Sequence, residues 1–326
     1  MDILNNPVIT YDCIRASVQA TDAEISSFSV ENGDILFQRS SETLEDVGRA
    51  NVYIDDRVAV FGGFVIRGKK KANYNPLFFR YLLSSPYARK RIIPMGAGAQ
   101  HFNIGQEGLS KVLLNFPSIE EQTKIASLLH LLDERIATQS KLIEKLESLI
   151  KGIAQKIVRC NKPNVRLSEC LECKSSTLQE SDVYEQGTYP VYGANGIVGY
   201  LDNYNTESEA VYIIKDGSGV GTVSYVTGKC SATGTLNTLQ AKEGYSLQYL
   251  YYLLKVFNFE PYKTGMAIPH IYFKDYGKAK VFCPSYTEQL QYARLLSAIE
   301  SNLSIEMNIL TNLSLQKQYL LRQMFI

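Results

Sequence analysis

The sequence lacks the signals that direct a chain across or into a membrane. Its first residues, MDILNNPVIT, have neither the basic start nor the apolar run of a secretory signal. Nowhere does it approach the roughly 18 consecutive apolar residues of a membrane span. We therefore expect a cytoplasmic protein without a membrane partner. Its 326 residues, 45% of them hydrophobic, suffice for about two folded domains.

Metal-binding patterns are also scarce. Six cysteines in so long a chain do not make a disulfide framework, and an intracellular chain keeps them reduced. Only Cys170 and Cys173 have a metal-like C-x-x-C spacing, and a structural zinc site needs four ligands. The histidines, His101, His130 and His270, have no cysteine or carboxylate nearby at ligand or triad spacing. No metal site is expected.

Each stretch that comes near a catalytic or nucleotide-binding motif departs from it. GFVIRGKK, from Gly63, has phosphate-loop spacing but ends in lysine where a hydroxyl residue would hold magnesium. DGSGVGTVSYV, from Asp216, has the wrong glycine spacing for a dinucleotide site and continues as an alternating strand. NPLF, from Asn75, lacks one proline of the N-P-P-aromatic motif of amino-methyltransferases, which hold a flipped adenine. We expect no catalytic residue and no cofactor.

Acidic residues are missing between Arg57 and Gln106, although the net charge of the chain is only +1. A block of positive charges without acidic residues attracts a polyanion. The ordinary alternative is that acids elsewhere in the fold balance it. The positive charges of the block are Arg57, Arg67, Lys69, Lys70, Lys71, Arg80, Arg89, Lys90 and Arg91.

The sequence does contain an internal repeat. PSIEEQTKIASLL begins at Pro117 and PSYTEQLQYARLL at Pro284, an offset of 167 residues. Upstream, VGRANVYIDDRVAVFGGFVIRGK from Val47 matches VGTVSYVTGKCSATGTLNTLQAK from Val220 in length and in both ends. The chain is therefore a tandem duplication in which a strand-rich part leads into the P-S segment.

Two further pairs extend the repeat. PLFFRYLLSS from Pro76 and LQYLYYLLKV from Leu247 both have the pattern of a short amphipathic helix. Gly98 and Gly265 each lie nineteen residues before their P-S pair.

Each P-S pair should start a long helix. Ser118 with Glu121, and Ser285 with Glu288, fit the capping box, in which serine and glutamate satisfy free N–H groups at the helix start. Residues then recur at alternating steps of four and three, a heptad seam typical of a coiled coil. The seam comprises Leu132, Ile136, Gln139, Ile143, Leu146, Ile150, Ile153 and Ile157, and then Ile299, Leu303, Glu306, Leu310, Leu313, Lys317, Leu320 and Met324.

Connectivity favours an antiparallel pair of helices. The first helix ends around Lys162 and Pro163, where the second globular part begins at once, so only an antiparallel pair is joined by short links. The polar seam residues Gln139 and Glu306 would then meet at a pseudo-two-fold axis, and we predict that they are in contact. The alternative is that each helix packs only on its own domain.

The predicted fold is therefore α+β, with two strand-rich globular domains separated by two long antiparallel coiled-coil helices. We expect the domains at residues 1–116 and 161–283. The central long helix is expected at 117–160 and the C-terminal one at 284–326.

Globular parts that lead through PSIEEQ or PSYTEQ into long helices resemble the specificity subunit of type I restriction-modification systems. SSETLEDVG from Ser40 and YPVYGANGIVGYLDNY from Tyr189 each resemble a recognition-domain subtype of that family. The resemblance covers nearly the whole chain. It implies two target recognition domains, each reading one half of a bipartite double-stranded DNA sequence. It also implies methyltransferase (modification) subunits and restriction (translocase-endonuclease) subunits as partners, which carry out methylation and cleavage.

The start of the chain departs from this family pattern. MDILNNPVI resembles the interior of a first recognition domain. In the family that domain opens with a further strand-and-turn region, as RLSECLECKSS from Arg166 does for the second domain. We therefore expect the first domain to be incomplete at its N-terminal side, and a silent, truncated variant is one alternative.

DNA contacts are expected on the predicted turns between strands. Lysine and arginine neutralise phosphates, whereas side chains that reach base edges discriminate sequence. The candidates in the first domain are Arg39, Ser41, Arg49, Lys69, Lys70, Lys71, Gln100, His101 and Asn103. Those in the second are Tyr192, Asn195, Lys215, Ser218, Lys229, Asn237 and His270.

Two other classes of function stay open. A coiled-coil scaffold with protein-binding domains would show no salt-dependent affinity for DNA. A stand-alone nucleic-acid enzyme would need an active site, which the motifs above do not supply.

Overall fold

The computed structural model describes residues 2–325, which form two compact units. Unit 1 comprises the described residues up to Ser140 together with those from Asn308 onward, and unit 2 runs from Lys141 to Met307. No helix within residues 2–325 is long and apolar enough to cross a lipid bilayer.

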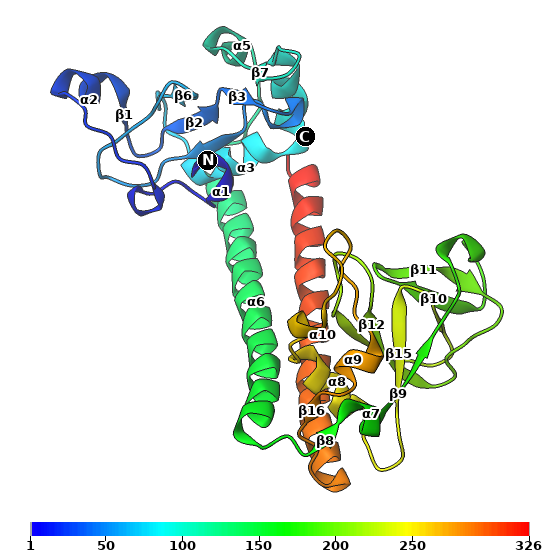
Figure 1. Ribbon diagram of the computed structural model, residues 1–326. Helices are drawn as coiled ribbons and strands as arrows, with labels where there is room; N and C mark the ends of the chain where they lie inside the picture. The colour runs from blue at the N-terminus through cyan, green and yellow to red at the C-terminus, as the bar shows by residue number, and fades with distance from the viewer. Residues whose placement is uncertain (1, 326) are drawn as a thin grey trace. The chain divides into compact units, whose positions relative to one another are not determined.

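Two long helices, α6 (Ile119–Cys160) and α10 (Tyr286–Gln323), carry the predicted heptad seam (Figure 1). Every predicted seam position is buried or half-buried, while most positions between them are exposed. In unit 1, Asp133 of α6 forms an ion pair with Lys317 of α10, and the earlier Ala126 shares a cluster with the later Phe325. The two helices are therefore antiparallel there, as connectivity predicted.

The predicted contact at the centre of the seam concerns both units. Gln139 belongs to unit 1 and Glu306 to unit 2. Both side chains are half-buried. Their contact stays a prediction.

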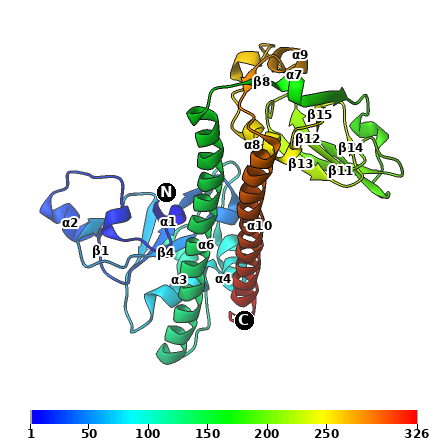
Figure 2. The same cartoon turned by 90° about the horizontal axis from the view of Figure 1, so that it is seen from below.

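Unit 2 is built on a four-stranded antiparallel sheet. Its elements are β8 (Val165–Arg166), α7 (Leu167–Cys170), β9 (Leu171–Ser175), η4 (Glu180–Asp182), β10 (Tyr189–Gly193), β11 (Gly196–Leu201), β12 (Glu209–Ile214), β13 (Val223–Thr227), β14 (Ser231–Ala232), β15 (Leu236–Ala241), α8 (Leu247–Lys255), η5 (Glu260–Tyr262), α9 (Phe273–Tyr276) and β16 (Lys280–Val281). The main sheet has the order β13, β12, β15, β9, beside a smaller sheet β11, β10, β14 and the pair β16, β8. Figure 2 shows α8 between the main sheet and α10.

The alternation of a strand explains how the main sheet holds two cores. Side chains point to opposite faces in turn along a strand. Val211 and Ile213 of β12 join the large cluster that includes α8, whereas Ala210, Tyr212 and Ile214 join a second cluster on the other face. Because both faces are covered, β12 is almost wholly apolar.

Unit 1 repeats this plan with shorter strands. Its elements are α1 (Asp2–Asn5), η1 (Tyr11–Cys13), α2 (Asp22–Phe28), β1 (Ser29–Val30), β2 (Ile35–Gln38), β3 (Ser40–Ser41), η2 (Leu44–Asp46), β4 (Ala50–Val52), β5 (Ala59–Val60), β6 (Val65–Gly68), α3 (Pro76–Ser84), α4 (Pro86–Ile92), η3 (Ile93–Met95), β7 (Phe102–Asn103) and α5 (Gln106–Ser110). The main sheet has the order β4, β2, β6, with two-stranded pairs β1, β5 and β3, β7. The predicted helix pair is confirmed, because α3 and α8 each have nine residues and begin 171 positions apart.

The glutamine of the repeated P-S-x-x-E-Q segment joins the long helix to the globular part in both units. In unit 2, Gln289 Oε1 accepts the Ser246 N–H at 2.9 Å, and Gln289 Nε2 donates to the Pro284 carbonyl at 2.9 Å. In unit 1, Gln122 makes the same two bonds with Asn75 and Pro117. Both glutamines are only 2% exposed.

The short helices α3 and α8 start with side-chain caps. The side chain of Asn75 accepts the Phe78 N–H, and Pro76 occupies the first turn, where its missing N–H costs nothing. Ser246 caps α8 in the same way. The NPLF stretch thus has a helix-starting role in this fold.

The predicted capping box is confirmed in full at the start of the second long helix and in its serine half at the start of the first. In the second copy both halves are present, because Ser285 Oγ accepts the Glu288 N–H and Glu288 Oε2 accepts the Ser285 N–H. In the first copy Ser118 Oγ accepts the Glu121 N–H at 3.4 Å.

An acid on each long helix binds the short helix of the same unit. Glu300 of α10 accepts hydrogen bonds from the hydroxyls of Tyr251 and Tyr252 at 3.0 and 2.7 Å, and from Lys255 at 3.0 Å. Asp133 does the same for Tyr81 of α3 at 2.8 Å. Burial works against the charge of Glu300, but the bonds from Tyr252 and Lys255 hold its pKa below the usual 4.5 of a glutamate.

The Glu300 contact predicts a pH-dependent stability. A carboxylate whose pKa is lower in the folded state stabilises that state above pH 4.5, and this contribution is lost as the pH falls through the folded pKa. Glu300→Ala should lower the free energy of unfolding of unit 2 by about 2 kcal/mol at pH 7, because buried hydroxyls lose their acceptor. Urea unfolding between pH 3 and 7 measures both effects. Glu300→Gln, which keeps an acceptor, should lose the part of the pH dependence that Glu300 contributes. The exposed Glu147→Ala is the control, and an equal loss there would contradict the account.

Candidate nucleic-acid interface

Unit 1 presents an exposed turn between η3 and β7. Ala97 and Asn103 exchange two backbone hydrogen bonds of 2.9 and 2.8 Å, which close the loop between them. Gly98 has φ of +142°, and a Cβ there would lie 2.0 Å from the His101 carbonyl oxygen, so only glycine fits. Gln100, His101 and Asn103 are exposed. The turn therefore holds polar side chains outward on a fixed backbone.

Unit 2 presents the same turn 167 residues later. Thr264 and His270 exchange backbone bonds of 2.9 and 2.7 Å. Gly265 has φ of +88°, and a Cβ there would lie 2.3 Å from the Ile268 carbonyl oxygen. Met266 at the tip is fully exposed.

The residue after each turn forms a backbone hydrogen bond with a basic residue that directly follows a main-sheet strand. The Arg39 carbonyl, just after β2, accepts the Ile104 N–H at 2.9 Å. In unit 2 the Lys215 carbonyl, just after β12, accepts the Ile271 N–H at 2.9 Å. A cation that can neutralise a phosphate thus lies beside polar groups that can contact base edges, which is the division of tasks that DNA reading needs.

Side chains also link turn and strand end at equivalent positions. The Ser40 hydroxyl donates to the Asn103 side-chain oxygen in unit 1. In unit 2, His270 Nδ1 lies 2.6 Å from Asp216 Oδ1. Because Asp216 holds Nδ1, Nε2 is the ring nitrogen of His270 that can contact a base.

Within unit 1, the structure brings part of the predicted set together. Arg39, Ser41, Gln100, His101 and Asn103 all lie on the turn or on the strand end beside it, since Ser41 pairs with Phe102. Arg49 is close, because its carbonyl accepts the Gln38 N–H, and its guanidinium pairs with Asp46 at 2.7 Å.

The predicted lysine run lies elsewhere in unit 1. In the β2–β6 register Ile35 faces Gly68, so Lys69, Lys70 and Lys71 follow β6 at the end of β2 opposite to Arg39. Lys69 pairs with Glu31 at 3.3 Å, and Lys70 lies over the Tyr74 ring. These lysines do not join the turn.

In unit 2, Ser218 follows Gly217, whose N–H bonds to Pro269 of the turn. Tyr192 lies on the same side of unit 2 as Lys215. Its carbonyl accepts the Thr233 N–H, and two residues later the Thr235 carbonyl accepts the Lys215 N–H. Asn195 lies in the exposed turn between β10 and β11 just beyond Tyr192.

Two predicted contacts of unit 2 are placed differently. Lys229 lies over the rings of Tyr204 and Tyr189, near the start of β10 and so away from its Tyr192 end. Asn237 is not on a turn. It lies in β15, which begins one residue earlier. Its side chain is 3% exposed and donates to the Tyr276 hydroxyl at 3.1 Å.

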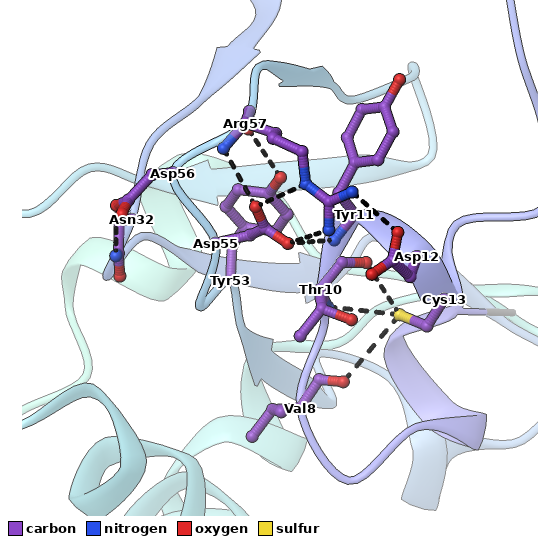
Figure 3. A network of polar contacts seen from close by, with 10 residues as sticks. All are labelled: Val8, Thr10, Tyr11, Asp12, Cys13, Asn32, Tyr53, Asp55, Asp56 and Arg57. Carbon is purple, nitrogen blue, oxygen red and sulfur yellow. Dashed lines mark hydrogen bonds and ion pairs between the residues drawn. The ribbon is translucent and has the colours of Figure 1, made fainter.

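Four of the nine positive charges of the basic block form ion pairs with acids of the same unit. Figure 3 shows Arg57 held by Asp55 and Asp12, at 2.8 and 2.7 Å, with hydrogen bonds from Arg57 holding the pKa of Asp55 well below its ordinary value. Arg67 pairs with Asp34 and Glu31, Lys69 with Glu31, and Arg80 with Asp133. Arg89 donates to the carbonyls of Glu45 and Val47. Charge density alone therefore does not locate a DNA surface.

Sequence reasoning missed Ser40 and Asp216, which position Asn103 and His270. Asp216 lies 54 residues from His270, so neither local motifs nor spacing join them. The signal that could have identified the two turns is the repeat, because an offset of 167 residues makes the turn of unit 1 equivalent in sequence to that of unit 2. Among residues 2–325, no group of three or more histidine, cysteine or acidic side chains could hold a metal ion.

The two halves define a tandem-repeat α+β protein in which each copy presents an equivalent exposed turn with an obligatory glycine. A family model, the type I restriction modification DNA specificity domain, matches residues 2–148 and again 162–315. The chain therefore belongs to the type I restriction-modification DNA specificity domain family.

Individual relatives agree with this assignment. The EcoprrI specificity subunit, a type I restriction enzyme component of Escherichia coli, is 26% identical over 117 residues, which cover 36% of this chain and 29% of that protein. The chain thus spans about a third of the length of the curated relatives it matches.

Solved structures show the same fold. The type I restriction-modification S subunit from M. genitalium aligns over 92% of this chain and 84% of that chain, with a TM-score of 0.62 and 20% identity. A structure of a type I R-M system aligns over 90% and 81%, with a TM-score of 0.56 and 16% identity. The predicted fold class is confirmed.

Proposed function

We propose that this chain is the cytoplasmic DNA sequence-recognition subunit of a type I restriction-modification complex. Each unit reads one half of a bipartite target in double-stranded DNA. Methyltransferase subunits and restriction subunits bind to it and carry out methylation and cleavage, so the chain itself is not an enzyme and needs no cofactor.

The repeated turn carries this proposal. Ala97–Asn103 and Thr264–His270 share their closing bonds, their obligatory glycine and their basic neighbour, while the exposed side chains differ between the two. The exposed side chains are polar in unit 1, whereas unit 2 presents the apolar Met266 and Ile268 together with His270. A common backbone with different side chains suits two readers of different half-sites, because base edges offer both hydrogen-bonding groups and the thymine methyl group. A scaffold that binds only protein has no need for this arrangement.

Salt dependence of DNA binding tests the proposal. Arg39→Ala and Lys215→Ala should each weaken binding of all sequences and reduce the slope of log K against log salt by about 0.9, one phosphate contact. Fluorescence anisotropy with duplex DNA at several salt concentrations measures this slope. Lys151→Ala, an exposed change on α6, should leave it unchanged. Absence of any salt-dependent affinity in the unaltered chain would favour the protein-binding scaffold.

A further inference from the structure

The turn of unit 2 presents apolar side chains at its tip. Met266 is fully exposed, and Ile268 is 58% exposed. No side chain of residues 265–268 contains a nitrogen or oxygen atom. The tip of this turn therefore cannot recognise a base through side-chain hydrogen bonds, which are the usual means of reading a base edge.

The turn of unit 1 has the opposite chemistry on an equivalent backbone. At the offset of 167, Gln100 and His101 correspond to Ala267 and Ile268. Both turns are closed by the same pair of backbone bonds and contain the same obligatory glycine. The difference between the two turns thus lies in the exposed side chains, polar in one unit and apolar in the other.

The backbone of unit 2 holds the apolar tip away from the core. The Gly217 N–H donates to the Pro269 carbonyl at 3.0 Å, just after the tip. Ile271, three residues beyond Ile268, is 0% exposed and belongs to the large cluster around α8. The tip therefore stays in water although an apolar core begins close by. Large apolar side chains that a fold keeps exposed indicate a binding surface.

The neighbours of the tip favour DNA as the partner. The Lys215 carbonyl accepts the Ile271 N–H, so a cation that can neutralise a phosphate lies beside the turn. His270, whose Nδ1 lies 2.6 Å from Asp216, closes the turn and keeps Nε2 for a base or phosphate. The one apolar group that base pairs present in the major groove is the 5-methyl group of thymine.

We propose that Met266 and Ile268 contact the 5-methyl group of a thymine in the half-site that unit 2 reads. This inference rests on the proposed DNA-recognition function and adds the base that the second turn selects. Because the tip has no side-chain donor or acceptor, it recognises the methyl group itself and not the pairing pattern of the base. 5-Methylcytosine presents the same group at the same place in the major groove, so it should substitute for thymine at this position.

Base analogues test this contact with the full-length chain. The half-site is first selected from duplexes in which that half is randomised, and thymine should be enriched. At each selected thymine, fluorescence anisotropy then compares thymine, deoxyuridine, cytosine and 5-methylcytosine, each opposite its complementary base. At the contacted position thymine should bind about fourfold more tightly than deoxyuridine, and 5-methylcytosine about fourfold more tightly than cytosine, the effect of burying one methyl group. Deoxyuridine in the spacer between the half-sites should change nothing.

Variants of the tip assign the preference to these side chains. Met266→Ala and Ile268→Ala should each reduce the preference for the methyl group, and the double variant should abolish it. Both positions are exposed, so the fold is retained. Leu295→Ala is the control, because it removes an apolar side chain that is 50% exposed on α10 of the same unit.

The outcomes separate this inference from the proposed function. Sequence-selective binding with equal affinity for thymine and deoxyuridine at every position overturns the methyl contact and leaves DNA recognition intact. A preference for the methyl group that persists in the double variant overturns it too, because another part of the chain then reads the base. Absence of any salt-dependent DNA affinity contradicts both and assigns the apolar tip to a protein partner.

Discussion

Replacing Gln289 by methionine should lower the free energy of unfolding of unit 2 by about 3 kcal/mol. The two side chains are similar in volume, but methionine cannot bond the Ser246 N–H or the Pro284 carbonyl, which Gln289 satisfies at 2.9 Å each. Each buried group left without a partner costs about 1–3 kcal/mol. Urea unfolding followed by circular dichroism measures the loss.

The control lies two residues further along the same helix. Gln291 is exposed, so Gln291→Met should change the stability by less than about 0.5 kcal/mol. Gln122→Met should destabilise unit 1 through the equivalent bonds to Asn75 and Pro117. A loss at Gln289 no greater than that at Gln291 would show that this glutamine does not join helix and globular part.

Substituting the glycine of either turn should abolish discrimination between DNA sequences at that half-site. A Cβ at Gly98 or Gly265 would lie 2.0 or 2.3 Å from a carbonyl oxygen of its own turn, so alanine must displace the backbone that holds the exposed side chains of the turn. Loss of one good base contact reduces discrimination by about 1–3 kcal/mol, roughly fivefold to 150-fold. Competition binding with randomised half-sites measures this ratio.

Gly62→Ala is the matched control in unit 1, because a Cβ there meets no atom within 4 Å. It should leave discrimination unchanged. If Gly98→Ala and Gly265→Ala bind all sequences with unaltered preference, the turns do not read the bases.

The sequence predicts those parts of the fold that follow from hydrophobic periodicity and from the internal repeat. The heptad seam and the two short helices follow from local patterns, and the 167-residue offset aligns the two turns and the two long helices without any structure. The role of the glutamine in P-S-x-x-E-Q was not predictable in the same way. Its partner lies 47 residues away in unit 1 and 43 in unit 2, and only the folded chain brings them together.

The candidate DNA contacts show the same limit. Lys69 and Arg39 appear equivalent as basic turn residues, but the β2–β6 register places them at opposite ends of β2. Asn237 is predicted to lie on a turn between strands, whereas β15 already begins at Leu236. Strand boundaries and register depend on pairing with distant residues, which one sequence does not reveal.

Mapping methylated adenines in cells tests the central claim most directly. Cells that contain the methyltransferase and restriction subunits should be compared with and without this chain by sequencing that detects the modified base. A DNA-recognition subunit predicts methylation at one bipartite sequence that appears only with the chain present. The same set of methylated adenines in both cells would contradict the account.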